Sequence, residues 1–162
     1  MRISMKILIY QAKSAFGNVN SNLEAIEQTL NAAAKMNVDV AVFPELFLSR
    51  YNLGQRLRDV ALIIDGPQIA CICQLAESVD VAVVVKFPEK DGQNLFNTAI
   101  AIMADGGVVT KHRKFFLFGD SEKEIFQPGD GFATFEIVDH TSRLGPQPIA
   151  PDVNSDRRSA KR

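Results

Sequence analysis

The sequence contains no tryptophan, only two cysteines and almost no net charge. Its apolar runs fall well short of the roughly 20 residues that span a bilayer. The early stretch MKILIYQA is too short and too quickly polar for a signal peptide. A net charge of −1 gives no basic field that would attract nucleic acid or a membrane surface. We therefore expect a cytoplasmic protein with no nucleic-acid partner and no membrane partner.

The two cysteines, Cys71 and Cys73, fall in the stretch GPQIACICQLAESVD, which is typical of a helix. Residues two apart on a helix do not face each other, and no further Cys or His lies nearby, so this pair is a poor metal site. We expect both to be small, buried core residues in a reducing compartment, distant from Glu45. The alternative, a reactive thiol, requires an electropositive and partly exposed setting. No cofactor is expected.

The order of hydrophobic patterns predicts an α/β layered domain. Apolar, β-branched runs predict strands, a period of three to four residues predicts helices, and Gly-containing turns separate the last strands. The expected strands cover 6–12, 38–44, 81–89, 97–104 and 108–114, and the expected helices cover 20–37 and 67–79. Residues 57–65 are ambiguous and fit a short helix.

The composition changes near the C-terminal end of the sequence. Residues 141–162 hold three of the seven prolines and carry a local charge of +3, with no apolar period. Such a segment cannot bury enough apolar surface to offset the entropy of folding. We therefore expect a partial domain over 1–140, followed by a disordered tail over 141–162.

In the stretch DVAVFPELFLSRYN at 39–52, the charged residue Glu45 interrupts the apolar residues from 40 to 48. Residues 39–43 predict a buried strand, Pro44 ends it, and Glu45 stands directly before more apolar residues. Removing an isolated carboxylate from water costs several kcal/mol unless it is paired or its pKa moves. A glutamate at the carboxyl end of such a strand is therefore a site candidate.

A second stretch, GGVVTKHRKFFLFGDSEKEIFQPGD, combines a basic cluster with an acidic segment. Lys111 is expected to face solvent. Lys114 precedes four apolar residues, which fits either a site residue or a surface lysine whose stem covers apolar area. Glu122 and Glu124 fit either site carboxylates or solvated loop residues.

Three motifs in this order resemble the carbon–nitrogen hydrolase (nitrilase) superfamily: VFPELFLSRYN, NLFNTAIAIMADGGVVTKHRKFFLF and SEKEIFQPGD. The resemblance runs from about residue 5 to about residue 138. It implies the N-terminal part of an α-β-β-α sandwich. Its members cleave nitriles, amides and carbamoyl compounds. The implied partner is therefore a small-molecule amide or nitrile substrate, and a homo-oligomer is left open.

The resemblance also implies roles for individual residues. The family uses a cysteine nucleophile, a glutamate that takes the thiol proton, a lysine that stabilises developing charge and a second glutamate. Glu45 matches the base. Lys114 matches the lysine, with His112 in place of the usual tyrosine. Glu122, six residues before Pro128, matches the second glutamate best. Glu124 is the fallback.

The nucleophile is the departure from this pattern, because no cysteine follows Cys73. We expect a family member truncated before the catalytic cysteine, or one whose reading frame is lost near His140, and hence inactive as written. The alternative is a non-catalytic pseudoenzyme or fragment that binds a homologous subunit. A chain that lacks the rest of the family domain would leave strand edges and an apolar sheet face uncovered. A smaller departure is Lys86, where the family often has glycine.

Overall fold

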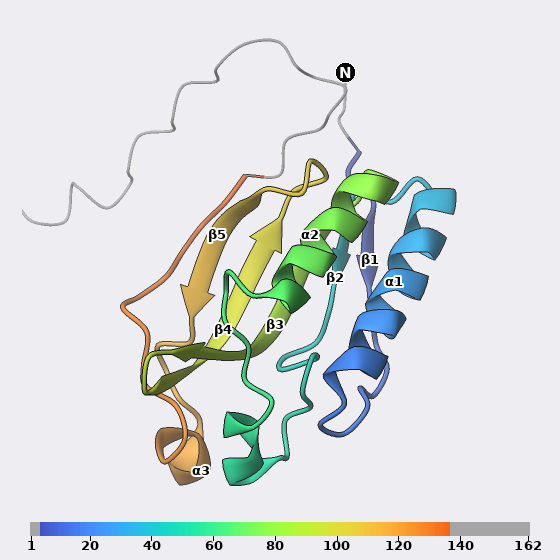
Figure 1. The fold of residues 1–162 in the computed structure, drawn as a ribbon. Coiled ribbons are helices and arrows are strands. Elements are labelled where there is room, and N and C mark those ends of the chain that lie inside the picture. Colours follow the sequence, from blue (N-terminus) through green and yellow to red (C-terminus); the bar gives the residue numbers. More distant parts are fainter. Residues whose placement is uncertain (1–3, 137–162) are drawn as a thin grey trace, which may run out of the picture.

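The computed structural model describes residues 4–136, so the tail expected over 141–162 lies outside the described residues. Five strands form one sheet in the order β1-β2-β3-β4-β5 (Figure 1). Strands β1, β2 and β3 run parallel, whereas β3–β4 and β4–β5 are antiparallel. The strands are β1 (Ile7–Ile9), β2 (Val40–Val42), β3 (Ala82–Asp91), β4 (Asn94–Ile102) and β5 (Val108–Arg113).

Two helices, α1 (Val19–Lys35) and α2 (Pro67–Val79), lie side by side over one face of the sheet (Figure 1). Successive side chains of a strand point to opposite faces, so only alternate residues of each strand meet the helices. The main core is the set of side chains between these two layers, including Ile26, Leu30, Ile69, Ile72, Val83, Val85, Ile100 and Ile102. Each fully buried aliphatic side chain stabilises the fold by about 1.5–3 kcal/mol.

The helix boundaries follow from local chemistry. Asn18 caps α1, because its side-chain oxygen accepts a hydrogen bond from the amide of Ser21 at 3.1 Å. Helix α2 begins with Pro67 at its first position, where the missing amide hydrogen has no consequence.

The prediction that both cysteines are buried is wrong for Cys71, which is exposed. The buried face of α2 is formed by Ile69, Ile72 and Ala76, and Cys71 points in a different direction. Cys73 is partly buried and packs against the main core, as its position on the apolar face predicted.

The predicted short helix over 57–65 is also wrong in its position. A 3-10 helix, η1, covers Gly54–Arg58, and the chain that follows is extended. Leu62 pairs with β3, since its amide donates to the Pro88 carbonyl and its carbonyl accepts from the Lys90 amide, both at 2.8 Å. These backbone hydrogen bonds keep the segment around Leu62 extended. A local helical pattern cannot reveal the pairing with β3, because the residues of β3 that pair with Leu62 lie more than twenty residues further along the chain.

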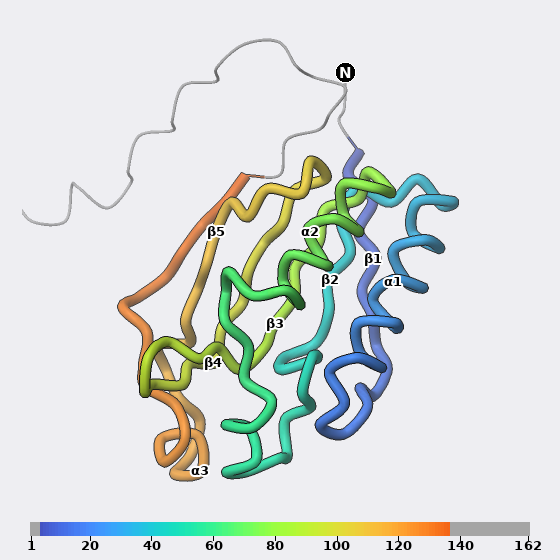
Figure 2. The backbone as a smooth tube through the Cα atoms, in the orientation of Figure 1, coloured from blue at the N-terminus to red at the C-terminus, as the bar shows by residue number. Residues whose placement is uncertain are grey.

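After β5 the chain forms a short helix, α3 (Gly119–Lys123), and then runs back beside β5, as the orange segment of Figure 2 shows. The close approach occurs at Gly129, whose amide donates to the Lys114 carbonyl at 3.0 Å. A Cβ atom at Gly129 would lie 2.2 Å from the Arg113 carbonyl oxygen, so only glycine fits.

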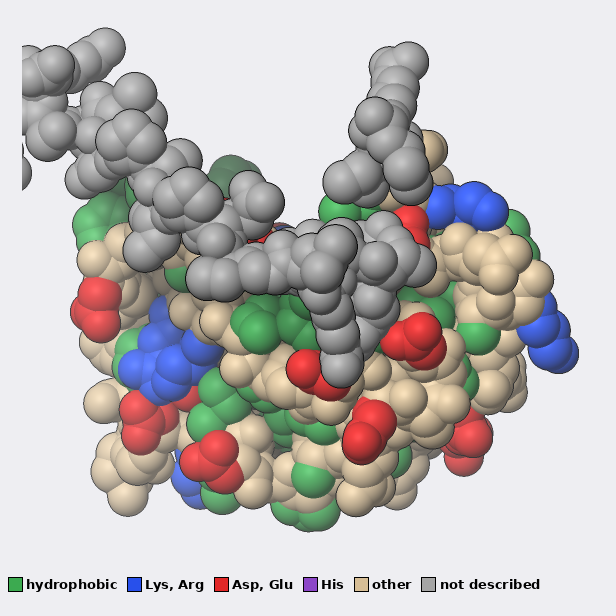
Figure 3. Space-filling model, turned by 90° about the horizontal axis from the view of Figure 1, so that it is seen from above, with side chains coloured by type: hydrophobic (Ala, Val, Ile, Leu, Met, Phe, Trp, Pro, Cys, Tyr) green, Lys and Arg blue, Asp and Glu red, His purple; other side chains and the backbone are tan. Residues whose placement is uncertain are grey.

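The sheet and its single helical layer form the N-terminal part of an α-β-β-α sandwich. On β1, Ile7 and Ile9 are 54% and 66% exposed, which matches the expected uncovered apolar surface. Figure 3 looks onto one end of the molecule, where separate acidic side chains are interspersed with hydrophobic ones. Within residues 4–136, no helix is long and apolar enough to cross a membrane.

A buried ion cluster fixes the β3–β4–β5 part of the sheet. Glu89 is 1% exposed and accepts hydrogen bonds from Arg113 (2.7 and 2.8 Å), Thr98 (2.7 Å) and Lys111 (3.2 Å). Burial acts to raise the pKa of Glu89, but these hydrogen bonds outweigh it and lower the pKa to about 2. Lys111, expected to face solvent, is exposed but also pairs with this buried carboxylate.

We expect Glu89→Gln to destabilise the fold at pH 7 by on the order of 3 kcal/mol, because it removes the charge that Arg113 and Lys111 neutralise. The folded-state pKa lies below the unfolded one. The contribution of ionised Glu89 to the free energy of unfolding is therefore present above about pH 4.5 and is lost as the pH falls toward 2. Urea unfolding at pH 7 and pH 3 measures this loss. Glu27→Gln, on the exposed face of α1, is the control and should change stability by less than about 0.5 kcal/mol. If the free energies of unfolding of wild type and Glu89→Gln differed by the same amount at both pH values, this account would be contradicted.

Candidate active site

The structure brings together the three side chains that the sequence singled out. The Lys114 ammonium donates hydrogen bonds to Glu45 Oε1 and to Glu122 Oε1, each at 2.9 Å. Glu124, the fallback, is exposed and lies at the end of α3, away from this ammonium group. The candidate site is therefore an acid–lysine–acid cluster, formed by Glu45, Lys114 and Glu122.

Glu45 is positioned by a turn that follows β2. The next residue, Leu46, has a φ of +50°, a conformation that a branched residue rarely adopts and that costs roughly 1–3 kcal/mol. Leu46 is fully buried, and its carbonyl accepts from the amides of Ser49 (3.1 Å) and Arg50 (2.7 Å). Packing and backbone bonds thus hold the strained turn that directs Glu45 toward the cluster.

Lys114 directly follows β5, and its backbone is held on both sides. Its amide donates to the Asn97 carbonyl at 2.8 Å, and its carbonyl accepts from the Gly129 amide at 3.0 Å. The strand that precedes Lys114 is not next to the strand that precedes Glu45, because β3 and β4 lie between β2 and β5. The turn after β2 and the long lysine side chain span this distance.

Asn97 is the site residue that the sequence did not single out. It is 4% exposed, and its side-chain amide donates to Glu45 Oε1 at 2.7 Å. Its backbone carbonyl binds Lys114, so one residue of β4 positions both charged groups. A polar residue at the start of the apolar run NTAIAIMA was the available signal.

The two carboxylates of the cluster differ in how many bonds they accept. Both hydrogen bonds to Glu45 end on Oε1, and Oε2 accepts none from residues 4–136. Glu122 uses both oxygens: Oε1 accepts from Lys114 and from the Tyr51 hydroxyl (2.5 Å), and Oε2 from the Phe118 amide (2.6 Å). Only Glu45 therefore keeps an oxygen available for a further proton.

Burial and hydrogen bonding act against each other at Glu122. The side chain is 4% exposed, so the alternative of a solvated loop carboxylate is wrong. Burial acts to raise the pKa of Glu122, but the bonds from Tyr51, Phe118 and Lys114 outweigh it and hold the pKa below its ordinary value. Burial and the bond to Glu122 raise the pKa of Tyr51 to about 12, so Tyr51 stays a donor at neutral pH.

Lys114 stays charged in this setting. Burial acts to lower the pKa of Lys114, but hydrogen bonds to the two carboxylates outweigh it and raise the pKa above its ordinary value. The Glu45 side chain is 37% exposed. Its open oxygen can thus meet a small molecule that enters from solvent.

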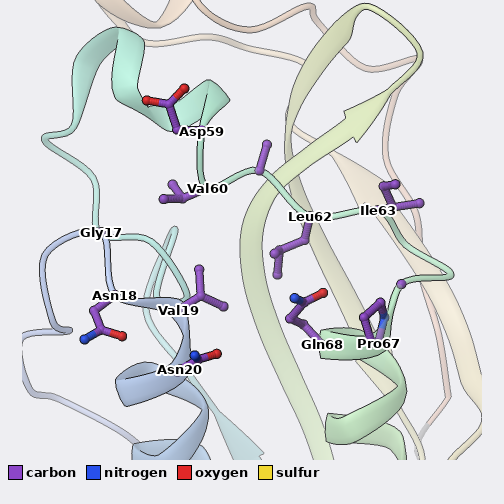
Figure 4. Close-up of a pocket in the computed structure, with 12 residues that line it drawn as sticks. Gly17, Asn18, Val19, Asn20, Asp59, Val60, Leu62, Ile63, Pro67 and Gln68 are labelled. Atoms are coloured by element: carbon purple, nitrogen blue, oxygen red, sulfur yellow. The ribbon is translucent and has the colours of Figure 1, made fainter.

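A pocket of about 480 Å³ opens beside Glu45, at the carboxyl ends of β1 and β2. This volume suits a small molecule. Its walls are apolar at Ile9 and Val42, and its charged residues are Lys13, Glu45 and Lys86. A second pocket of about 570 Å³ lies near the first turns of α1 and α2, where Asp59 is its one charged lining residue (Figure 4). Of these two pockets, the first offers an acid and a cation together.

Neither cysteine of the chain reaches the cluster. Gly106, in the turn after β4, packs so closely on Cys73 that a Cβ there would lie 3.0 Å from its carbonyl oxygen. Asn97 lies near the opposite end of β4, five residues before Ile102. At about 3.3 Å per residue, that separation is roughly 16 Å. Within residues 4–136, no group of three His, Cys, Asp or Glu side chains could hold a metal ion.

The class of protein follows from a match to a family model. Residues 6–148 match the carbon–nitrogen hydrolase family, and the chain belongs to that family. This agrees with the order of motifs in the sequence and with the half-sandwich fold.

The match covers only part of the length of the relatives described here. A "Hydrolase in pqqF 5'region" from Pseudomonas protegens is 33% identical over 138 residues, which are 83% of this chain and 47% of that protein. An (R)-stereoselective amidase from Pseudomonas sp. is 34% identical over 132 residues, or 80% of this chain and 46% of that protein. The chain therefore spans about half the length of the curated relatives it matches.

A solved structure shares the fold. It is a mutant of an amidase from Nesterenkonia sp. AN1, described with acrylamide added at the active-site cysteine. It superposes with a TM-score of 0.73 at 23% identity, covering 79% of this chain and 51% of that one.

The hydrogen bonds of Glu122 predict its effect on stability. We expect Glu122→Gln to lower the free energy of unfolding by about 1–3 kcal/mol, since an amide nitrogen in place of Oε2 cannot accept from Phe118. Glu124→Gln, two residues away and exposed, is the matched control and should stay within about 0.5 kcal/mol. Urea unfolding followed by circular dichroism measures both. Equal effects of the two substitutions would show that Glu122 is not held as described.

Proposed function

We propose that this chain provides the base and the lysine of a site that hydrolyses the carbon–nitrogen bond of a small amide. The observation that carries the proposal is the Lys114 ammonium, 2.9 Å from both Glu45 and Glu122, with Glu45 in the lining of a pocket of small-molecule size. Membership of the carbon–nitrogen hydrolase family and the likeness to an amidase support it.

The hydrogen-bond pattern assigns different roles to the two carboxylates. Glu45 is the general base, because it lines the pocket and its Oε2 accepts no bond from the described residues. Glu122 is the anchor of Lys114, because all its bonds are already made and a low pKa keeps it ionised. Lys114 donates to the oxygen on which charge develops.

The reaction requires a thiol, which Cys71 and Cys73 do not supply from α2. In the proposed sequence, Glu45 takes the thiol proton and the sulfur attacks the amide carbon. The tetrahedral oxyanion beside Lys114 then collapses, and the nitrogen leaves as ammonia with the proton that Glu45 returns. Water next attacks the thioester, again losing a proton to Glu45, and releases the carboxylic acid and the thiol.

The first test uses the chain of 162 residues itself. We expect no hydrolysis of butyramide above that of a Glu45→Ala control, because base and lysine alone cannot form the covalent intermediate. Ammonia release measures turnover. Hydrolysis that falls on Glu45→Ala would mean that another residue acts as nucleophile, and it would overturn the requirement for an added thiol.

The second test supplies the thiol. Residues 1–136 are joined to the C-terminal half of the (R)-stereoselective amidase, and we expect amide hydrolysis to appear. Glu45→Gln should then lower kcat by about 10²–10⁴-fold, the usual contribution of a general base. Glu124→Gln is the control and should leave kcat unchanged. A folded, active chimera that is insensitive to Glu45→Gln would contradict the proposed role. The rival function, a non-catalytic subunit, predicts no turnover in any of these proteins.

A further inference from the structure

The pocket beside Glu45 contains a lysine that the acid–lysine–acid cluster does not use. Lys86 lies in the middle of β3, directly opposite Ala99 of β4. Two residues further along, Pro88 lies opposite Asn97, and alternate residues of a strand share a face. Lys86 therefore projects from the same face of the sheet as Asn97, which holds Glu45.

Lys86 has no ion-pair partner among residues 4–136. The ion pairs there involve Lys111, Arg113 and Lys114. Glu45, the one carboxylate in the pocket lining, is already bound to Lys114. Lys86 is also partly buried, in a strand flanked by apolar neighbours. A partly buried ammonium group without a counter-charge is unfavourable unless an anion comes to it.

The charges around the pocket favour an anionic guest. Lys86 and the more exposed Lys13 line it, with Lys114 close behind Glu45, against the single carboxylate of Glu45. Ile9 and Val42, the apolar lining residues on the same face of the sheet as Lys86, suit a short hydrocarbon segment between two polar ends. One end would be the group that reacts beside Glu45 and Lys114, and the other would meet Lys86.

We propose that Lys86 selects amides that carry a carboxylate at the far end of a short carbon chain. The proposal rests on the function proposed above and names its substrate class. Along β3, Lys86 lies two residues from the level of Asn97, or roughly 6.6 Å. A chain of two or three carbons between amide and carboxylate, with one salt-bridge contact, matches that separation.

The test compares two ligands that differ in one group. Succinamate has a carboxylate where butyramide has its terminal methyl, so it isolates the charge. Binding to the 162-residue chain is followed by NMR through the Asn97 side-chain amide, which hydrogen-bonds Glu45. We expect succinamate to bind about tenfold more tightly, as suits one charge-assisted hydrogen bond, and to lose this advantage at high salt.

Three variants assign the effect to Lys86. Lys86→Met should abolish the preference for succinamate while leaving butyramide binding unchanged. Lys86→Arg should retain it, because the positive charge is kept. Lys90→Met is the matched control, since Lys90 is an exposed lysine on the same face of β3 and does not line this pocket. It should behave as wild type.

The outcomes separate this inference from the proposed function. Equal binding of the two ligands, or a preference that survives Lys86→Met, would overturn the role of Lys86 and leave the amide site intact. No response of Asn97 to either ligand would count against both proposals. A preference lost in Lys86→Met and kept in Lys86→Arg supports the carboxylate-bearing substrate class.

Discussion

The ammonium group of Lys114 is the interaction on which the candidate site depends. Two carboxylates from segments far apart in the sequence approach each other only because this cation lies between them. Without it, Glu45 and Glu122 would repel, and the buried Glu122 would carry an uncompensated charge that costs several kcal/mol. The Nζ atom of Lys114, at the end of β5, thus joins the turn after β2 to helix α3.

The position of Lys114 is itself fixed by the strand that precedes it. Arg113 and Lys114 are consecutive, so their side chains point to opposite faces of the sheet. Arg113 binds the buried Glu89 on one face, and Lys114 binds Glu45 and Glu122 on the other. Arg113 therefore anchors the end of β5 to the buried Glu89, and the next residue, Lys114, contributes its ammonium group to the site. Gly129 completes this arrangement by packing directly on the backbone between them.

Glu122 and Glu45 are both glutamates, but the number of hydrogen bonds that each accepts suits them to different roles. Glu122 accepts three hydrogen bonds and is almost fully buried, which suits a fixed negative charge. Glu45 accepts two on one oxygen and remains partly exposed, which suits proton transfer. The same contrast separates Lys114, which is bound on both sides, from Lys86, which faces the pocket without a described partner. Glu122 and Lys114, whose charges are already paired, give the site its structure. Glu45 and Lys86 keep groups that can bind a further molecule.

The sequence by itself determined the α/β class, the two long helices and most strands, because these depend on periodicity. It singled out Glu45 as a charge beside an apolar run, and Lys114 through the resemblance to the family. Only the tertiary structure showed that Glu122, and not Glu124, joins the cluster, since its hydrogen bond from Tyr51 comes from a segment 71 residues away. It also decided the extended path through Leu62, the exposure of Cys71 and the bridging role of Asn97. Each of these depends on a partner more than twenty residues away or on which face of an element meets the core, and no local pattern of residues encodes such a distance.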